Sequence, residues 1–434
     1  MAEAGNHLST IWLGSPQASD PGLLQSMQQA LAGIADKLLV PEDVDSGGVF
    51  DRIERTIREE QDSLGELVLV VGARTHLFGT CVRQLLAVME DPSVGIAAPA
   101  SSKAMLSRAS TPPAYHTKQE AEAYAAAQEA SGKAVQERLV LDSGCFVVRR
   151  AALAAVGGFE RAFRSWHYGL PDFCLRLRTA GWGVRFVPSA YVHEASDPAA
   201  EAGLDAADAA LFRQRHGFDC LYSCNTRPEL LRHVRLSEAS PAVLEAGCAC
   251  GGNLLRIQSE HPEAALYGIE LSEASAAVAR QFAQVYAFDV EDFSMPEWEG
   301  RFDAVICGDL LEHLRDPWQV VRNFCRITRP GGRIIISVPN VMHISNLAGM
   351  LLDGNWAYQD QGIRDRTHLR FFTKKTACEL VKQGGYHVAA VEARVFAMPQ
   401  ELHELCDKLT PLLGADVGRR ELEAYQWVVV GERS

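Results

Sequence analysis

The stretch VLEAGCACGGN, residues 243–253, decides how the second half of the chain is interpreted. It contains a C-x-C cysteine pair and also a glycine-rich turn with Gly247, Gly251 and Gly252. A single C-x-C without a second pair of ligands at zinc-ribbon spacing is a weak metal signal. The turn directly follows a strand pattern, AVLEA, and precedes a helix pattern, GNLLRIQSE, which is where a phosphate or carboxylate is bound. We therefore predict a nucleotide-binding turn and no metal site.

The pattern around this turn alternates between strands and helices. Short aliphatic segments, expected to be strands buried on both faces, are AVLEAG, LYGIEL, VYAFDV, DAVICGD and RIIISVPN, and YHVAAVEARV and YQWVVVGER follow at the C-terminal end. Helical segments lie between the early strands, an order typical of a parallel sheet with helices on both faces. Residues 241–434 are therefore predicted to form a doubly wound, Rossmann-like α/β domain.

Acidic residues lie where the predicted strands end. Glu270 ends LYGIE, and its position after the glycine turn is typical of a carboxylate that binds ribose hydroxyls. Asp289 and Val290 follow the third strand, and Asp309 follows the fourth, just before Glu312 and His313 in DLLEH. The carboxyl edge of such a sheet is its usual ligand-binding edge. These features alone leave a dehydrogenase open as an alternative.

This half of the chain resembles a class I S-adenosylmethionine-dependent methyltransferase. The resemblance rests on VLEAGCACGGN, LYGIE, FDV, DLLEHLRDP and RPGGRIIISVPN, in that order. It implies S-adenosylmethionine as the cofactor, held by Glu245, Gly247, Ala249, Gly251 and Asp309 at the methionine moiety, Glu270 at the ribose, and Asp289 and Val290 at the adenine. Ala249 stands where the family has its middle glycine, a change of one methyl group.

Histidines beyond the strands indicate what is methylated. An alcohol needs a base to remove its proton, which contributes roughly 10²- to 10⁴-fold. The candidates are His313, His343 and His368, and Asp365 lies beside His368 in GIRDRTHLRFFT. We take Asp365 and His368 as the first choice for a base and its orienting partner, with a purely structural Asp–His network as the alternative.

The segment GNWAYQDQGIRDRTHLRFFT resembles a branch of these methyltransferases found in bacterial surface-polysaccharide clusters. The resemblance implies a carbohydrate acceptor, in the form of a nucleotide sugar, a lipid-linked glycan or a finished chain. Trp356 and Tyr358 are then candidates to stack on a pyranose ring, or else serve as packing for the segment.

The first half of the chain resembles the later part of a family-2 glycosyltransferase domain of the GT-A type. The matching stretches are LVLVVGARTHLFGTCVRQLLAVMEDPSVGIAAP, GCFVVRRAALAAVGGFERAF and GLPDFCLRLRTAGWGVRFVPSAYVHEAS. GART, residues 72–75, stands where the family has an acidic metal-binding motif, and Leu170 replaces the first aspartate of D-x-D-x-x-x-R, although Asp172 and His193 remain. We expect a degenerate module over residues 1–195 that positions a glycan, binds a partner or mediates homo-oligomerisation.

Length and composition agree with two domains. The chain has 434 residues, of which 47% are hydrophobic, and we expect residues 196–240 to link the two halves. A net charge of −13 argues against nucleic acid as a partner. The N-terminus lacks a basic leader, and no apolar run is long enough to span a membrane. The cysteines lie scattered in apolar runs, as reduced thiols do, so we expect a cytoplasmic protein.

The sequence thus predicts a methyltransferase of sugar hydroxyls with an N-terminal supporting module. A bifunctional glycosyltransferase and methyltransferase is the second reading, and it predicts a sugar-nucleotide activity that depends on Asp172. A non-catalytic scaffold for glycan assembly is the third, and it predicts cofactor binding without turnover.

Overall fold

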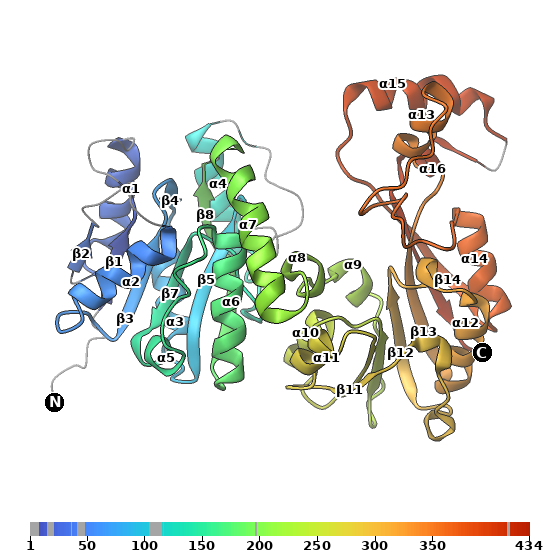
Figure 1. The fold of residues 1–434 in the computed structure, drawn as a ribbon, viewed down its shortest axis with the longest axis horizontal. Helices are drawn as coiled ribbons and strands as arrows, with labels where there is room; N and C mark the ends of the chain where they lie inside the picture. Colours follow the sequence, from blue (N-terminus) through green and yellow to red (C-terminus); the bar gives the residue numbers. More distant parts are fainter. Residues whose placement is uncertain are drawn as a thin grey trace. The chain divides into compact units, whose positions relative to one another are not determined.

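The computed structural model describes residues 8–14, 21–35, 37–40, 48–103, 115, 117–195, 198–414 and 417–434. The chain forms two compact units, Met1–Thr226 and Arg227–Ser434, drawn from blue to green and from green to red in Figure 1. The predicted linker, residues 196–240, is divided between the two units. The first seven residues, on which the expectation of no leader partly depends, lie outside the described residues.

The N-terminal unit is built on one mixed sheet with the strand order β2-β1-β3-β7-β5-β8-β4, and β6 pairs with β8. Its strands are β1 (Leu8–Trp12), β2 (Lys37–Leu39), β3 (Leu67–Val71), β4 (Thr75–Leu77), β5 (Val94–Ser101), β6 (Gln136–Glu137), β7 (Cys145–Arg149) and β8 (Gly183–Glu194). Strand β7 runs antiparallel to β3 and β5, whereas β1 pairs in parallel with both of its neighbours. The α/β prediction for this half is confirmed, while its glycosyltransferase-like character stays a prediction.

Helices accompany this sheet in the N-terminal unit. They are α1 (Pro21–Leu31), α2 (Val49–Glu59), α3 (Cys81–Val88), α4 (Lys118–Ala130), α5 (Arg150–Ala155), α6 (Trp166–Thr179), α7 (Pro198–His216) and α8 (Cys220–Ser223). Strand β3, with the sequence LVLVV, is buried at every position, as expected of a strand covered on both faces. Helix α7 packs on α6, so the polar stretch after residue 197 belongs to this unit.

The C-terminal unit is built on a second sheet with the strand order β11-β10-β9-β12-β13-β15-β14. Its strands are β9 (Ala242–Ala246), β10 (Ala265–Glu270), β11 (Gln284–Ala287), β12 (Phe302–Gly308), β13 (Thr328–Pro339), β14 (His387–Arg394) and β15 (Gln426–Glu432). The first five in chain order are parallel, and β15 pairs antiparallel with both β13 and β14. The predicted doubly wound sheet and its two closing strands are confirmed.

Helices and short 3₁₀ turns connect these strands. They are α9 (Pro228–Leu231), α10 (Gly252–Glu260), α11 (Glu273–Ala279), η1 (Val290–Asp292), η2 (Pro296–Trp298), η3 (Leu311–His313), α12 (Pro317–Ile327), α13 (Ile344–Leu352), α14 (Lys374–Gln383), α15 (Gln400–Leu409), η4 (Thr410–Leu412) and α16 (Arg419–Glu423). Among the described residues, no helix combines the length and the apolar character needed to cross a membrane.

The second sheet has a hydrophobic core on each face. Leu244 and Val305 belong to a cluster that includes side chains of α12 and α14, whereas the adjacent residues Val243 and Ala304 belong to a cluster with side chains of α10 and α11. Successive strand residues point to opposite faces, so these continuous apolar strands bury both. Helices on both faces leave the carboxyl ends of the parallel strands, which all lie at one edge of the sheet, uncovered by these helix layers.

Candidate cofactor and acceptor site

The glycine-rich turn between β9 and α10 has the left-handed backbone that its sequence predicts. Gly247, Ala249 and Gly251 have φ of +68°, +48° and +78°. A Cβ on Gly251 would lie 2.9 Å from the Cβ of Ala279 and 3.0 Å from the ring of Phe282, so this position has no room for a side chain. Ala249 adopts the left-handed conformation despite its methyl group, and the turn keeps the shape that a glycine would have there.

Glu270 braces this turn from the end of β10. One carboxylate oxygen accepts a hydrogen bond from the Ala249 amide and the other from the Ser272 amide, each at 2.8 Å. The amide of Gly247 donates to the Ile269 carbonyl at 2.8 Å, so the turn is joined to β10 through backbone as well. The structure therefore brings the predicted ribose-binding carboxylate to the turn.

Glu245 lies buried beneath the turn with half of its carboxylate unpaired. Oε1 accepts a hydrogen bond from Asn253 Nδ2 at 2.6 Å, while Oε2 has no hydrogen-bond partner among the described residues. Burial raises the pKa of Glu245 to about 8. An unpaired buried oxygen favours a hydrogen-bond donor or a cation beside it.

Asp289 and Val290 lie at the third strand end. Asp289 caps η1, and its Oδ1 accepts a hydrogen bond from the Glu291 amide at 3.0 Å. Val290 is buried in the hydrophobic cluster that covers the α12 face of the sheet. The carboxylate is thus held at the sheet edge with an apolar side chain beside it.

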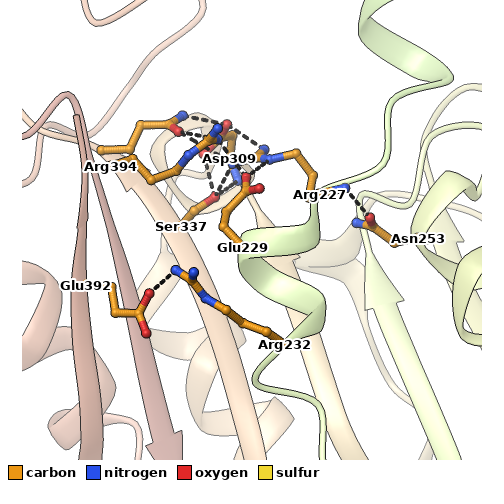
Figure 2. Close-up of polar contacts among 9 residues, drawn as sticks. Arg227, Glu229, Arg232, Asn253, Asp309, Ser337, Glu392 and Arg394 are labelled. Atoms are coloured by element: carbon orange, nitrogen blue, oxygen red, sulfur yellow. Dashed lines mark hydrogen bonds and ion pairs between the residues drawn. The ribbon is translucent and has the colours of Figure 1, made fainter. Parts of the chain in front are cut away.

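Asp309 is tied into a polar network that the sequence did not reveal (Figure 2). Its carboxylate accepts hydrogen bonds from Ser337 Oγ at 2.6 Å, Gln426 Nε2 at 2.8 Å and Arg227 Nη1 at 2.9 Å. Burial alone would raise the pKa of Asp309, but the Arg227 guanidinium outweighs it and holds this pKa below its usual value. Asp309 itself has φ of +52°, so its backbone is held in a conformation that few aspartates adopt.

Arg227 connects this network to the glycine turn. Its backbone amide donates to Asn253 Oδ1 at 2.6 Å, and Asn253 is the residue that donates to Glu245. Its guanidinium also pairs with Glu229, which receives Arg394 at 2.6 Å. Arg227 therefore links the carboxylates at the ends of β9 and β12 through Asn253 and Asp309. Figure 2 shows its contacts with Asn253, Glu229 and Asp309.

Three of the four predicted catalytic residues meet beside η3. The rings of His313 and His368 pack edge to face with centroids 4.7 Å apart. His313 Nδ1 lies 3.1 Å from Thr367 Oγ1, which donates to Asp365 Oδ1 at 2.7 Å. Backbone amides of the segment that carries His368 donate to the Glu312 carbonyl, so this segment is fastened to η3.

His343 has other partners. Its Nδ1 lies 2.8 Å from Ser345 Oγ, its ring packs edge to face on Tyr425, and its buried Nε2 has no hydrogen-bond partner among the described residues. Burial lowers the pKa of His343 to about 4, so the ring is neutral near pH 7. It caps α13 by accepting from the Ser345 amide, which gives it a structural role.

Residues 216–391 match a protein-family model described as "Methyltransferase domain". Ubiquinone biosynthesis O-methyltransferases from Pseudomonas paraeruginosa and Azotobacter vinelandii are 36% identical over 112 residues and 35% identical over 114 residues; these matches cover 24% and 25% of this chain and 47% of each relative. The C-terminal unit carries a methyltransferase domain. The chain spans about half the length of these curated relatives. A solved S-adenosylmethionine-dependent methyltransferase from Archaeoglobus fulgidus is 15% identical with a TM-score of 0.35, covering 52% of this chain and 99% of that chain.

The match to a methyltransferase domain implies S-adenosylmethionine as the cofactor, and the described residues fit it. The unpaired, buried Oε2 of Glu245 suits the ammonium of the methionine moiety, and the crowded Gly251 keeps the turn free of side chains. When bound, the cofactor supplies an electrophilic methyl group on a sulfonium. Leu310, which directly precedes η3, packs over the turn, 3.3 Å from where a Cβ on Gly247 would lie, so η3 begins beside the cofactor turn.

Asn253 and Arg227 are the residues of this site that sequence patterns missed. Asn253 directly follows the glycines of the turn, and Arg227 directly precedes the proline that starts α9. Asn253 lies in the stretch VLEAGCACGGN but was given no role there, and Arg227 lies outside every stretch that carried the methyltransferase resemblance. Their roles depend on contacts between residues 26 to 199 positions apart.

Replacing Arg227 by methionine is expected to lower the free energy of unfolding of the methyltransferase domain by about 3 kcal/mol, because Asp309 and Glu229 lose their shared cation in a buried site. In thermal unfolding, this corresponds to a midpoint roughly 6–12 °C lower for a domain of this size. Arg232→Met is the matched control, since its ion pair with Glu392 is exposed (Figure 2) and contributes at most about 1 kcal/mol. Equal midpoints for both variants would contradict this role of Arg227.

Proposed function

We propose that this protein is an S-adenosylmethionine-dependent O-methyltransferase that acts on a sugar hydroxyl of a bacterial surface glycan or its precursor. The carrying observation is the polar cluster of His313, Asp365, Thr367 and His368, which lies beside η3, just after the carboxyl end of β12. In this proposal the N-terminal unit is a non-catalytic, glycosyltransferase-like module.

The cluster supports oxygen as the acceptor atom. A neutral imidazole next to a carboxylate is the arrangement that removes a proton from an alcohol. Burial and the neighbouring His368 lower the pKa of His313, which favours the neutral form of its ring, the form that can accept a proton. The curated relatives of this domain are named O-methyltransferases.

A carbohydrate acceptor is supported by the segment before His368. This segment carries the resemblance to methyltransferases of polysaccharide clusters, and it presents two aromatic rings. Tyr358 is 57% exposed, and Trp356 is partly buried with its ring edge to face with Phe371 at 5.3 Å. Aromatic faces of this kind pack on the apolar faces of pyranose rings.

Contacts of Asp172 support a non-catalytic N-terminal unit. This buried carboxylate already receives Arg176 at 3.0 Å, Arg215 at 3.2 Å and His216 at 2.9 Å, which leaves little of it for a substrate. Within the part of this unit that the structure describes, no group of His, Cys, Asp and Glu has the spacing of a metal site. The bifunctional reading is the weaker one for this reason.

The proposal includes a cytoplasmic location. No disulfide bond is found among the described cysteines, and most of them are buried. Free thiols persist in a reducing compartment.

The decisive experiment combines binding with methyl transfer. The intact protein is titrated calorimetrically with S-adenosylhomocysteine and, separately, with nucleotide sugars in the presence and absence of Mn²⁺. Labelled S-adenosylmethionine is then incubated with sugar, nucleotide-sugar and catechol acceptors. Binding of S-adenosylhomocysteine together with label on a sugar oxygen supports the proposal, whereas label on catechol alone shows that the acceptor is not a sugar. Mn²⁺-dependent binding of a nucleotide sugar supports the bifunctional enzyme instead. Cofactor binding without any methyl transfer supports the non-catalytic scaffold.

Replacing Glu270 by glutamine is expected to weaken the affinity for S-adenosylhomocysteine by roughly 10- to 150-fold, since a charge-assisted hydrogen bond contributes about 1.5–3 kcal/mol. Glutamine keeps the size of the side chain but loses a carboxylate that also braces the Ala249 amide. Glu273→Gln is the control, because that carboxylate lies on the exposed side of α11 and pairs with Arg280. Unchanged affinity in Glu270→Gln would move the ribose contact elsewhere.

A further inference from the structure

The carboxylate of Glu312 is buried without a hydrogen-bond partner, next to His313 in the polar cluster described above. Only 1% of this residue is exposed, and neither Oε1 nor Oε2 has a hydrogen-bond partner among the described residues. Burial and the neighbouring Asp309 carboxylate raise the pKa of Glu312 well above its usual value. A buried carboxylate without donors is costly to a fold unless a ligand or a cation completes it.

The two neighbouring histidines both direct Nδ1 away as a hydrogen-bond donor. His368 Nδ1 lies 3.0 Å from the Ile363 carbonyl, which only accepts. His313 Nδ1 lies 3.1 Å from Thr367 Oγ1, whose own proton goes to Asp365, so the hydroxyl accepts from the ring. An imidazole that donates through Nδ1 offers its lone pair at Nε2. A carbonyl or hydroxyl at the second ring nitrogen is the usual support of a metal-binding histidine.

We propose that Glu312, His313 and His368 bind a divalent transition-metal cation such as Zn²⁺ or Mn²⁺. One ligand atom from each residue lies within 4.8 Å of the others. Bonds of about 2.1 Å to a shared cation place two ligands up to about 4 Å apart, so small side-chain rotations complete the site. Two imidazole nitrogens and one carboxylate suit borderline cations better than Mg²⁺ or Ca²⁺. The expectation of no metal rested on the cysteines, which are not part of this cluster.

The electrostatic surroundings favour a cation. The carboxylates of Asp309 and Asp365 both interact unfavourably with a charged Glu312, and the guanidinium of Arg227 opposes them. Asp365 is itself held by two hydrogen bonds from Thr367, at 2.7 and 2.8 Å. Two carboxylates, those of Asp309 and Asp365, thus neighbour the cluster in addition to its own Glu312, and Arg227 pairs directly with Asp309.

Three protein ligands leave at least one position of the cation open. Resting on the proposed function, we assign that position to the acceptor hydroxyl, whose pKa a divalent cation lowers strongly. The hydroxyl loses its proton to solvent, its oxygen forms the new bond to the methyl carbon, and the electron pair of the broken C–S bond leaves with sulfur. His368 then acts as a ligand that holds the cation rather than as the base.

Zinc titration of the EDTA-treated, full-length protein tests this inference. Wild type is expected to bind one equivalent of Zn²⁺ with a rise in thermal midpoint, and Co²⁺ should give the absorption bands of a site with nitrogen and oxygen ligands. Glu312→Gln and His368→Ala are each expected to weaken Zn²⁺ binding more than about 100-fold, and Thr367→Val about 10-fold through the orientation of His313. His261→Ala, which removes an exposed histidine next to Glu263, should bind as wild type does.

Two results would overturn the inference: no stoichiometric Zn²⁺ binding by wild type, or equal binding by wild type and Glu312→Gln. If His368→Ala does not fold, Glu312→Gln and Thr367→Val still decide the outcome. A parallel titration with S-adenosylhomocysteine separates the two proposals. Cofactor binding without Zn²⁺ binding refutes the metal site alone, whereas Zn²⁺ binding without cofactor binding refutes the methyltransferase function alone.

Discussion

Replacing Gly251 by valine is expected to abolish S-adenosylhomocysteine binding, with a loss of affinity greater than about 100-fold. Gly251 has φ of +78°, a conformation that costs a β-branched residue about 1–3 kcal/mol. Its Cβ would also lie 2.9 Å from Ala279 and 3.0 Å from Phe282. The turn must therefore shift, and its amides and the start of α10 move with it. Calorimetric titration of the purified variant measures the loss.

Gly300→Val is the control that separates the effect of a strained backbone from the effect of disturbing the glycine turn. Gly300 has a similar φ of +60°, but no atom lies within 4 Å of where its Cβ would be, and it stands between η2 and β12 rather than in the turn. We expect this control to lower the thermal midpoint slightly and to bind S-adenosylhomocysteine as wild type does. Wild-type affinity in Gly251→Val would remove the glycine turn from the cofactor site.

Replacing His368 by alanine is expected to lower kcat by roughly 10²- to 10⁴-fold, while affinity for S-adenosylhomocysteine changes less than about twofold. His368 is buried in the segment that also carries Asp365, and its ring packs on that of His313. No contact among the described residues joins His368 to the glycine turn. Turnover with the acceptor identified by the screen, and calorimetry with the product cofactor, measure the two effects separately.

His368→Gln and His261→Ala complete this test. Glutamine keeps a polar side chain but offers neither a base nor an imidazole ligand, so its kcat is expected to fall as in the alanine variant. His261 is exposed, and its loss should leave both kcat and affinity unchanged. Full activity in both His368 variants would return this residue to a structural role, and a parallel fall in cofactor affinity would point to a collapsed site.

Much of the methyltransferase domain could be predicted from the sequence because its signals are local. Continuous apolar runs such as IIIS and VICG mark strands buried on both faces. Gly247 and Gly251 mark a turn in which left-handed backbone is required, and both have it. Glu270 and Asp289 stand at strand ends, where chain direction alone brings them to one edge of the sheet.

The candidate acceptor site was only partly predictable. His313, Asp365 and His368 were singled out by residue type, and the structure brings them together. His343 was chosen by the same reasoning, but it caps α13 and contacts Tyr425. Residue type marks groups that can carry a proton, whereas the direction in which a ring points depends on how the chain packs around it.

By itself, the sequence determined the α/β class, the glycine turn and the order of strands and helices along the chain. These features depend on residue propensity, hydrophobic periodicity and the need for glycine at positive φ, all of which act over a few neighbouring residues. Only the tertiary structure decided that Arg227 holds Asp309 across 82 positions of the chain, and that Glu312 is buried without a donor. Burial and partner choice are properties of the packed domain. They set which carboxylates are neutralised by the protein and which are left for a ligand.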